Sequence, residues 1–182
     1  MVATGLPAIA LAACGVHYRP VSDVPVRIGA PYTVRGQTYT PAAQPGYDML
    51  GYATWYGSES GNKVALGEKF RPGWITGAHK TLPLPTYVEV TSLKTGRRIL
   101  VRVNDRGPFG ESARIIDLSR GAAELLGVRG TGKAAVRVRV AEPSERDRVA
   151  LRKGKPAREL SPLPPRALEA LRSRFVGGIG TL

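Results

Sequence analysis

The sequence predicts a mainly β domain, a small barrel with one or two short helices, flanked by an extended N-terminal tether and a C-terminal tail. Three observations support this fold class. Several short segments alternate apolar and polar side chains, as half-buried strands do. Turn-forming residues are frequent, with 22 glycines and 15 prolines among 182 residues. The central region has only one segment typical of a short helix, and this combination favours a small barrel.

The predicted strands cover residues 52–56, 87–91, 99–103 and 135–140. In the last of these, valine and arginine alternate, which places the valines on one face and the arginines on the other. The Lys-Thr-Gly segment at 94–96 is typical of a hairpin turn between the second and third strands. Ser119 is expected to cap a short helix over residues 120–126 that stops at Gly127.

The first 13 residues carry no charge and lead directly to Cys14, the only cysteine of the chain. An apolar run that ends in small residues is typical of the later part of a secretory signal. The tetrad at 11–14, Leu-Ala-Ala-Cys, resembles the lipobox of bacterial lipoproteins, which implies a signal peptide over 1–13 and a lipid on Cys14. The alternative is a cysteine that is merely buried or unpaired. No Lys or Arg precedes Arg19, so we expect the printed start to lie inside a longer signal.

The segments on either side of the barrel differ from it in composition. Residues 14–46 contain five prolines and no helical period, which predicts an extended, lipidated tether. Residues 142–182 form a basic, proline-rich tail, in which residues 166–175 have the apolar spacing of one short amphipathic helix. Two interpretations of this tail stay open, a largely disordered segment and a helix that docks or lies on a membrane surface.

The net charge of +13 indicates an anionic partner or surrounding, which means nucleic acid, a membrane surface or an acidic polymer. The positive charges are spread along the chain without a run of five, so a dedicated nucleic-acid-binding arm is not expected. The sequence also lacks a stretch of about 18 apolar residues, which excludes a transmembrane helix of the usual kind. With one cysteine, an intramolecular disulfide and a cysteine-built metal site are excluded as well.

Carboxylates beside glycines are the main candidates for chemistry. Glu68 follows a glycine, Asp105 lies in the segment Asn-Asp-Arg-Gly-Pro at 104–108, and Asp117 interrupts an apolar run. The sequence contains no glycine-rich phosphate loop with lysine and no His-Glu-x-x-His pair, and His79 is the only histidine in residues 47–141. By residue type alone, each acid could equally be solvated, paired with an arginine or used as a turn cap.

Five segments occur in a fixed order: Gly-Tyr-Ala-Thr-Trp-Tyr-Gly at 51–57, Gly-Glu at 67–68, Thr-Gly-Ala-His-Lys-Thr-Leu-Pro-Leu at 76–84, Val-Arg-Val-Asn-Asp-Arg-Gly-Pro-Phe at 101–109, and Ile-Ile-Asp-Leu-Ser-Arg at 115–120. Together they resemble the rare lipoprotein A family, the endolytic peptidoglycan transglycosylases. A Pro-Tyr-x-Val-x-Gly-x-x-Tyr segment at 31–39 is similar to that of family members. The resemblance implies a six-stranded double-psi β-barrel catalytic domain over residues 47–141. The remaining C-terminal residues are too few for the glycan-binding, sporulation-related repeat domain that ends many members.

The resemblance implies cleavage of the β-1,4 bond between N-acetylmuramic acid and N-acetylglucosamine without water, which leaves a 1,6-anhydro end. Asp105 is then the acid and subsequently the base, with Glu68 as its partner carboxylate. Five further residues are expected to bind or position substrate: His79, Trp55, Tyr56, Asn104 and Arg106. Asp117 is assigned to structure, by tying Arg114 or capping the helix. Neither a metal nor an organic cofactor is implied.

A second class of function stays open, a non-catalytic, expansin-like lipoprotein that binds peptidoglycan without cutting it. The segment before Glu68 favours this alternative, because it lacks the histidine and threonine typical of the family there, and the asparagine that family members have beside the glycine at position 67. A third class is a basic interaction protein that binds anionic lipid or nucleic acid. Nucleic acid is not expected as a partner, because an exported protein would not meet it.

The expected partners are peptidoglycan glycan strands, preferably those without stem peptides, and the membrane, through the lipid on Cys14. Cell-division or wall-synthesis proteins are further candidate partners. We expect a monomer in the bacterial cell envelope, anchored by its lipid and facing the periplasm, more on the outer than on the inner membrane.

Overall fold

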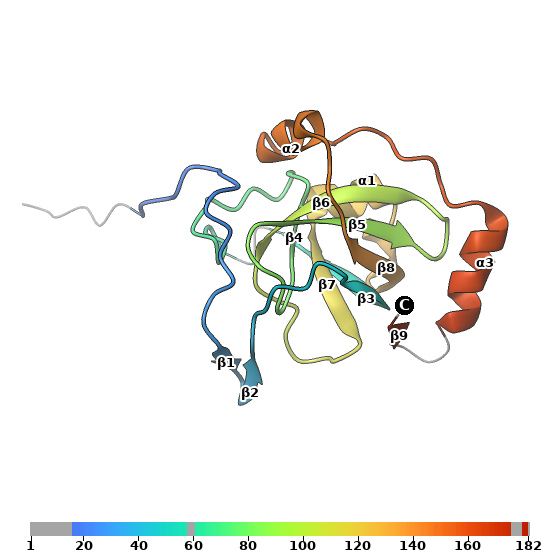
Figure 1. The fold of residues 1–182 in the computed structure, drawn as a ribbon, viewed down its shortest axis with the longest axis horizontal. Helices are drawn as coiled ribbons and strands as arrows, with labels where there is room; N and C mark the ends of the chain where they lie inside the picture. The colour runs from blue at the N-terminus through green and yellow to red at the C-terminus, as the bar shows by residue number, and fades with distance from the viewer. Residues whose placement is uncertain (1–15, 58–60, 176–179, 182) are drawn as a thin grey trace, which may run out of the picture.

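A computed structural model describes residues 16–57, 61–175 and 180–181 of the chain (Figure 1). Within these residues, six strands close into a barrel and three α-helices lie outside it. The barrel strands are β3 (Asp48–Tyr56), β4 (Thr76–Ala78), β5 (Thr86–Ser92), β6 (Arg98–Asp105), β7 (Arg114–Ser119) and β8 (Ala134–Val140). The other elements are β1 (Tyr32–Val34), β2 (Gln37–Tyr39), α1 (Arg120–Leu126), the 3₁₀ helix η2 (Arg129–Thr131), α2 (Glu145–Arg152), α3 (Pro165–Arg174) and β9 (Gly180–Thr181).

The barrel strands follow the order β7-β4-β6-β5-β8-β3, and β3 pairs with β7 to close the ring. The pairs β3–β7 and β4–β6 are parallel, whereas the remaining neighbours are antiparallel. Parallel neighbours require long crossover connections, so this topology brings together segments that are far apart in the sequence. The prediction of a mainly β, six-stranded barrel is confirmed.

Alternation of side chains along the strands fills the barrel. Val136 and Val138 of β8 are fully buried, and Arg137 and Arg139, which alternate with them, are only partly buried. The hydroxyl of Ser119 accepts a hydrogen bond from the amide of Ala122, and Gly127 ends α1 with a left-handed backbone at φ +77°. The predicted cap and stop of this helix are therefore confirmed.

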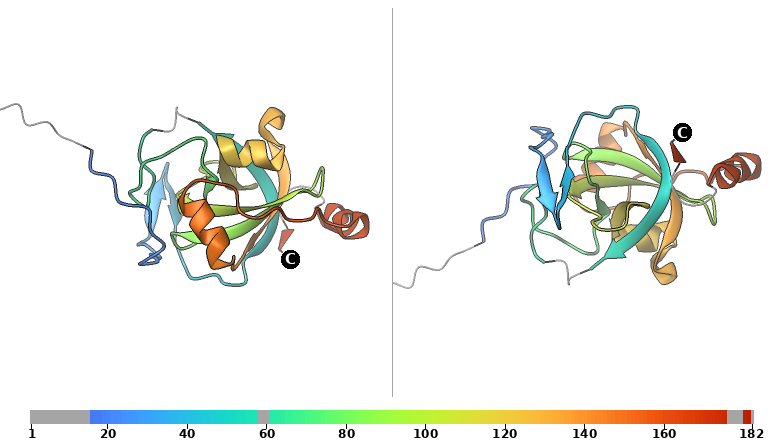
Figure 2. Two further views of the ribbon diagram at one scale, coloured as in Figure 1. Left: turned by 90° about the horizontal axis from the view of Figure 1, so that it is seen from above. Right: turned by 90° about the horizontal axis from the view of Figure 1, so that it is seen from below.

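The N-terminal segment, which was expected to be an extended tether, lies along the barrel (Figures 1 and 2). We call residues 19–28 the N-terminal strap. Its backbone bonds to the barrel domain at Gly67 and forms a two-hydrogen-bond bridge with Leu84. The prolines prevent a helix here, but an extended backbone leaves its carbonyl groups free to accept hydrogen bonds from barrel arginines. The hairpin β1–β2 follows and packs Tyr32 and Tyr39 against Phe109.

The C-terminal segment also packs on the barrel, with α2 over one end and α3 beside it (Figure 1). Leu151 of α2 is fully buried in the main core, and Leu168 and Leu171 of α3 pack against Leu50 and Leu93. The helix expected over residues 166–175 is thus present with its apolar face on the barrel, as in the docking alternative. Among the described residues, no helix is long and apolar enough to cross a membrane.

Gly154 fixes the end of α2 against the barrel domain. Its φ is +73°, and a Cβ added there would lie 2.2 Å from the ring of Trp74. We expect Gly154→Ala to lower the free energy of unfolding by about 1–3 kcal/mol, measured by urea denaturation. Gly36→Ala is the matched control, because its φ of +79° is similar and nothing lies within 4 Å of the added Cβ. Equal losses in the two variants would mean that contact with Trp74 contributes nothing.

Candidate active site

Asp105 is the last residue of β6, and backbone amides hold its carboxylate in place. Its Oδ1 accepts hydrogen bonds from the amide of Ala65, at 2.7 Å, and from that of Arg106, at 2.8 Å. Burial raises the pKa of the Asp105 carboxyl above its ordinary value, although both amides and the Arg106 charge act in the opposite direction. A fixed carboxyl with a raised pKa is suited to proton transfer.

Strand register places a second carboxylate near Asp105. Ala78 of β4 pairs with Asp105 on one side and with Asp117 of β7 on the other, and Asp117 also pairs with Thr54 of β3. Residues in register on neighbouring strands present their side chains to the same face of a sheet. We call these four residues, Asp105, Ala78, Asp117 and Thr54, the carboxylate row.

Small residues separate the two acids of the carboxylate row. Ala78 has only a methyl group, and Gly107 has none. A Cβ at Gly107, where φ is +136°, would lie 3.9 Å from Asp117 Oδ2. The hydroxyl of Thr54 donates to Asp117 Oδ1, and an Arg114 nitrogen lies 3.2 Å from Oδ2. Burial raises the pKa of Asp117 as well, so both carboxyls favour the protonated form more than exposed aspartates do.

Tyr56 lies two residues after Thr54 on β3, and hence on the same face of the strand. Its ring stacks on Phe70 with centroids 4.9 Å apart. Its hydroxyl is buried. Burial raises the pKa of this hydroxyl, and the negative charges of Asp105 and Asp117 raise it further. Tyr56 therefore lies near the carboxylate row, and its role in binding substrate stays a prediction.

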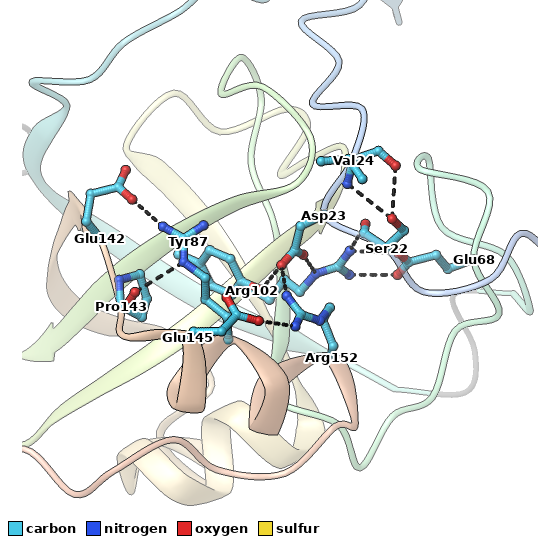
Figure 3. Close-up of polar contacts among 11 residues, drawn as sticks. Ser22, Asp23, Val24, Glu68, Tyr87, Arg102, Glu142, Pro143, Glu145 and Arg152 are labelled. Carbon is cyan, nitrogen blue, oxygen red and sulfur yellow. Dashed lines mark hydrogen bonds and ion pairs between the residues drawn. The ribbon is translucent and has the colours of Figure 1, made fainter.

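Glu68 is buried in an ion pair with Arg102 (Figure 3). Both of its oxygens accept hydrogen bonds of 2.8 Å from the Arg102 guanidinium, and Oε2 accepts a third from the Asn104 amide at 2.9 Å. Glu68 and Arg102 are 2% and 1% exposed, so this ion pair lies away from solvent. Asn104 turns toward Glu68, and its own Oδ1 has no partner among the described residues.

His79 is buried behind the site. Its Nδ1 accepts hydrogen bonds from the amides of Thr81 and Leu82, and its own amide donates to the Asp105 carbonyl at 3.0 Å. Burial, together with the charges of Arg106 and Lys80, lowers the pKa of His79 to about 3, so the ring is neutral at physiological pH. His79 is the first residue after β4, and it is only 3% exposed.

The side chains of Arg106 and Trp55 both make their hydrogen bonds outside the carboxylate row. The Arg106 guanidinium donates to the carbonyls of Leu82 and Ile28, and thereby joins the N-terminal strap to the site. The Trp55 indole N–H donates to the Arg129 carbonyl at 3.0 Å, next to η2, so the structure does not bring this ring to Asp105. Cys14, the predicted lipidation site, lies outside the described residues.

The sequence profile of the lytic transglycolase family matches residues 48–138, half of the chain and nearly all of the barrel. The chain belongs to this family. Its relatives include three curated proteins named endolytic peptidoglycan transglycosylase RlpA. That of Pseudomonas aeruginosa is 51% identical over 115 residues, which are 62% of this chain and 33% of the relative. Those of Neisseria meningitidis and Rickettsia bellii are 45% and 42% identical over 116 residues, covering 63% and 62% of this chain and 48% and 51% of theirs.

The chain thus spans about a third to a half of the length of these lytic transglycolase relatives. Solved structures with some likeness include the Streptomyces papain inhibitor, 23% identical with a TM-score of 0.46, which covers 56% of this chain and all of its own. Another is the apo form of a Clavibacter michiganensis expansin, 21% identical with a TM-score of 0.41, covering 54% of this chain and 52% of its own.

The sequence analysis assigned Asp117 to structure and did not name Thr54, whereas the fold of this lytic transglycolase domain places both in the carboxylate row. The expected tie to Arg114 exists, but Ser119, not Asp117, caps α1. A signal was available, because an aspartate inside an apolar strand must face away from the core. The parallel pairing that brings Thr54 to it could not be read from local pattern. No three His, Cys, Asp or Glu side chains in residues 16–57, 61–175 and 180–181 group as metal ligands.

Proposed function

We propose that this member of the lytic transglycolase family cleaves the β-1,4 bond between N-acetylmuramic acid and N-acetylglucosamine and leaves 1,6-anhydro ends. The carboxylate row carries this proposal, because Asp105 has a raised pKa and a second carboxyl on the same face. The names of the relatives support the same substrate and reaction.

In the proposed reaction, protonated Asp105 donates its proton to the glycosidic oxygen as the bond to the muramic C1 breaks. The resulting Asp105 carboxylate then takes the proton of the muramic C6 hydroxyl, whose oxygen forms the new bond to C1. One carboxyl thus acts first as acid and then as base, and no water is consumed. Asp117, in its ionised form, would stabilise the positive charge that develops on the sugar ring, and Thr54 orients it by their hydrogen bond.

We assign Glu68 to positioning instead of direct catalysis. Its carboxylate is neutralised by Arg102 and bound to Asn104, the residue before Asp105. The short segment that ends at Glu68 also supplies the Ala65 amide to Asp105. His79 has a comparable proposed role, since its amide fixes the Asp105 carbonyl.

The second candidate function is an expansin-like protein that binds peptidoglycan without cutting it. One observation favours it: the carboxylate that the family resemblance assigned as the partner of Asp105 is buried in an ion pair. We further propose that the protein acts in the bacterial cell envelope, anchored through a lipid on Cys14, and prefers glycan strands without stem peptides. Division or wall-synthesis proteins are its proposed protein partners.

The deciding experiment is digestion of purified sacculi, and separately of amidase-stripped glycan, by the chain with Cys14→Ser so that no lipid is attached. Mass spectrometry should find 1,6-anhydromuramic ends, more of them from the stripped glycan. Reducing muramic ends would indicate hydrolysis instead. The absence of new ends from both substrates, with glycan pull-down retained, would leave the binding protein.

A further inference from the structure

We propose that Asp23 of the N-terminal strap is a positioning residue for the transglycosylase reaction, because it clamps two distant segments onto Arg102 and thereby fixes the loop that holds Asp105. The inference rests on the proposed function. Figure 3 shows the arrangement, in which Asp23 lies between Arg102 of β6 and Arg152 of α2. The strap precedes the barrel in the sequence, α2 follows it, and the two meet at this aspartate.

Asp23 has three side-chain partners from three elements. Its Oδ1 accepts from Arg102 Nε at 3.1 Å, and its Oδ2 accepts from the Tyr87 hydroxyl at 2.8 Å and from Arg152. These hydrogen bonds hold the pKa of Asp23 below its usual value, although burial acts in the opposite direction. The neighbouring Ser22 carbonyl accepts a further 2.7 Å hydrogen bond from Arg102. The strap is thus fixed by charge-assisted hydrogen bonds, which are stronger than neutral ones.

The other edge of the same guanidinium binds Glu68, whose segment contacts Asp105. Arg102 binds both oxygens of Glu68, and the Arg19 amide of the strap donates to the Gly67 carbonyl at 2.8 Å. The strap and Arg102 therefore bind neighbouring residues, Gly67 and Glu68, of the segment at 64–68. This segment supplies the Ala65 amide to Asp105, so every link from Asp23 to Asp105 is a named contact or a few residues of chain.

A purely structural role would act differently. If Asp23 only attached the strap, its loss would loosen the strap and leave the Asp105 loop unchanged. If it positions Asp105, its loss should disturb the geometry of the reacting carboxyl, which lowers the rate of the chemical step more than substrate affinity. Displacement of a catalytic group by about 1 Å can cost as much as a hundredfold in rate.

The test compares Asp23→Asn with Glu89→Gln in the chain lacking lipid. Glu89 is the matched control, because it too is an acid facing two arginines, Arg139 and Arg98, but lies on β5 away from the segment at 64–68. For Asp23→Asn we expect kcat for anhydro-end formation to fall about tenfold with KM within about twofold, and both constants to be unchanged in the control. Arg152→Met is a second variant. It removes only the contact between α2 and Asp23, and Arg152 is 25% exposed.

Hydrogen exchange provides a readout besides activity. Exchange of the Ala65 and Arg106 amides, both bound to Asp105, should become several-fold faster in Asp23→Asn and in Arg152→Met. Faster exchange at Arg19 alone, with kcat unchanged, would overturn the proposal, and so would equal effects in Glu89→Gln. A wild-type chain that forms no anhydro ends would refute the transglycosylase function, and exchange alone would then decide whether Asp23 fixes the Asp105 loop.

Discussion

Asp105→Asn is expected to lower the rate of anhydro-end formation by about 10³-fold, since loss of general acid–base catalysis typically costs 10²–10⁴. The amide cannot give a proton to the glycosidic oxygen or take one from the C6 hydroxyl. Its Oδ1 can still accept the two backbone hydrogen bonds from Ala65 and Arg106. The site should therefore keep its shape while the chemistry stops, and binding to glycan should persist.

The same substitution should not destabilise the fold. Because the pKa of Asp105 is raised in the folded state, folding loses free energy as pH rises through the interval between the unfolded and folded pKa values. Asparagine does not titrate, so the Asp105→Asn variant does not lose folding free energy in this pH interval. We expect it to be at least as stable as wild type at pH 7, and the difference to vanish below the usual pKa range of aspartate.

Rate and stability are measured on the same preparations, by mass spectrometry of anhydro ends and by urea unfolding at several pH values. Wild-type activity should decline as pH rises past the raised pKa of Asp105, because the acid must begin protonated. Asp48→Asn is the control. Asp48 is paired with Arg137 and is the first residue of β3, whereas Thr54 and Tyr56 are near the other end of that strand. Activity of Asp105→Asn within tenfold of wild type would remove Asp105 from the catalytic role.

Arg102→Met is expected to cause the largest loss of stability in the barrel, about 3–5 kcal/mol, because it leaves a buried charge without its partner. Arg102 is 1% exposed and serves Glu68 and Asp23 together, at 2% and 16% exposure. Methionine fills similar space but leaves the Glu68 carboxylate in a dry environment. For a chain of this size, the loss corresponds to a fall of about 10 °C in Tm.

Thermal and urea unfolding of Arg102→Met measure this loss. Arg137→Met is the control, because its pair with Asp48 is 23% exposed on both sides and exposed pairs contribute about 1 kcal/mol or less. The double variant Arg102→Met/Glu68→Leu should recover most of the lost stability, since it removes the buried charge as well. Similar losses for Arg102→Met and Arg137→Met would mean that burial adds nothing to the importance of this ion pair.

Local pattern predicted most of the barrel. Valine–arginine alternation identified β8, and Ser119 with Gly127 defined the ends of α1. The helix α2 was missed, because its eight residues carry five charges and leave only Leu151 fully buried. Its position depends on Trp74 and Asp23, contacts that a local pattern does not contain.

The site was predicted only in part, for a related reason. Asp105 and Tyr56 lie in motifs that can be read directly, but the pairing of Thr54 with Asp117 joins strands more than 60 residues apart. The docking of residues 19–28 on the barrel could not be predicted from the local sequence pattern either. Its carbonyl groups accept from Arg102 and Arg106, and every residue type has such carbonyl groups.

The docked strap also limits how far the barrel can lie from a lipid on Cys14. A free tether from Cys14 to residue 46 could extend about 110 Å, but only five residue steps, about 17 Å, separate Cys14 from Arg19 at the barrel. With the proposed lipid on Cys14, the barrel would sit almost against the bilayer surface. The glycan would then have to come to the membrane, and cleavage would be confined to the layer of wall nearest to it.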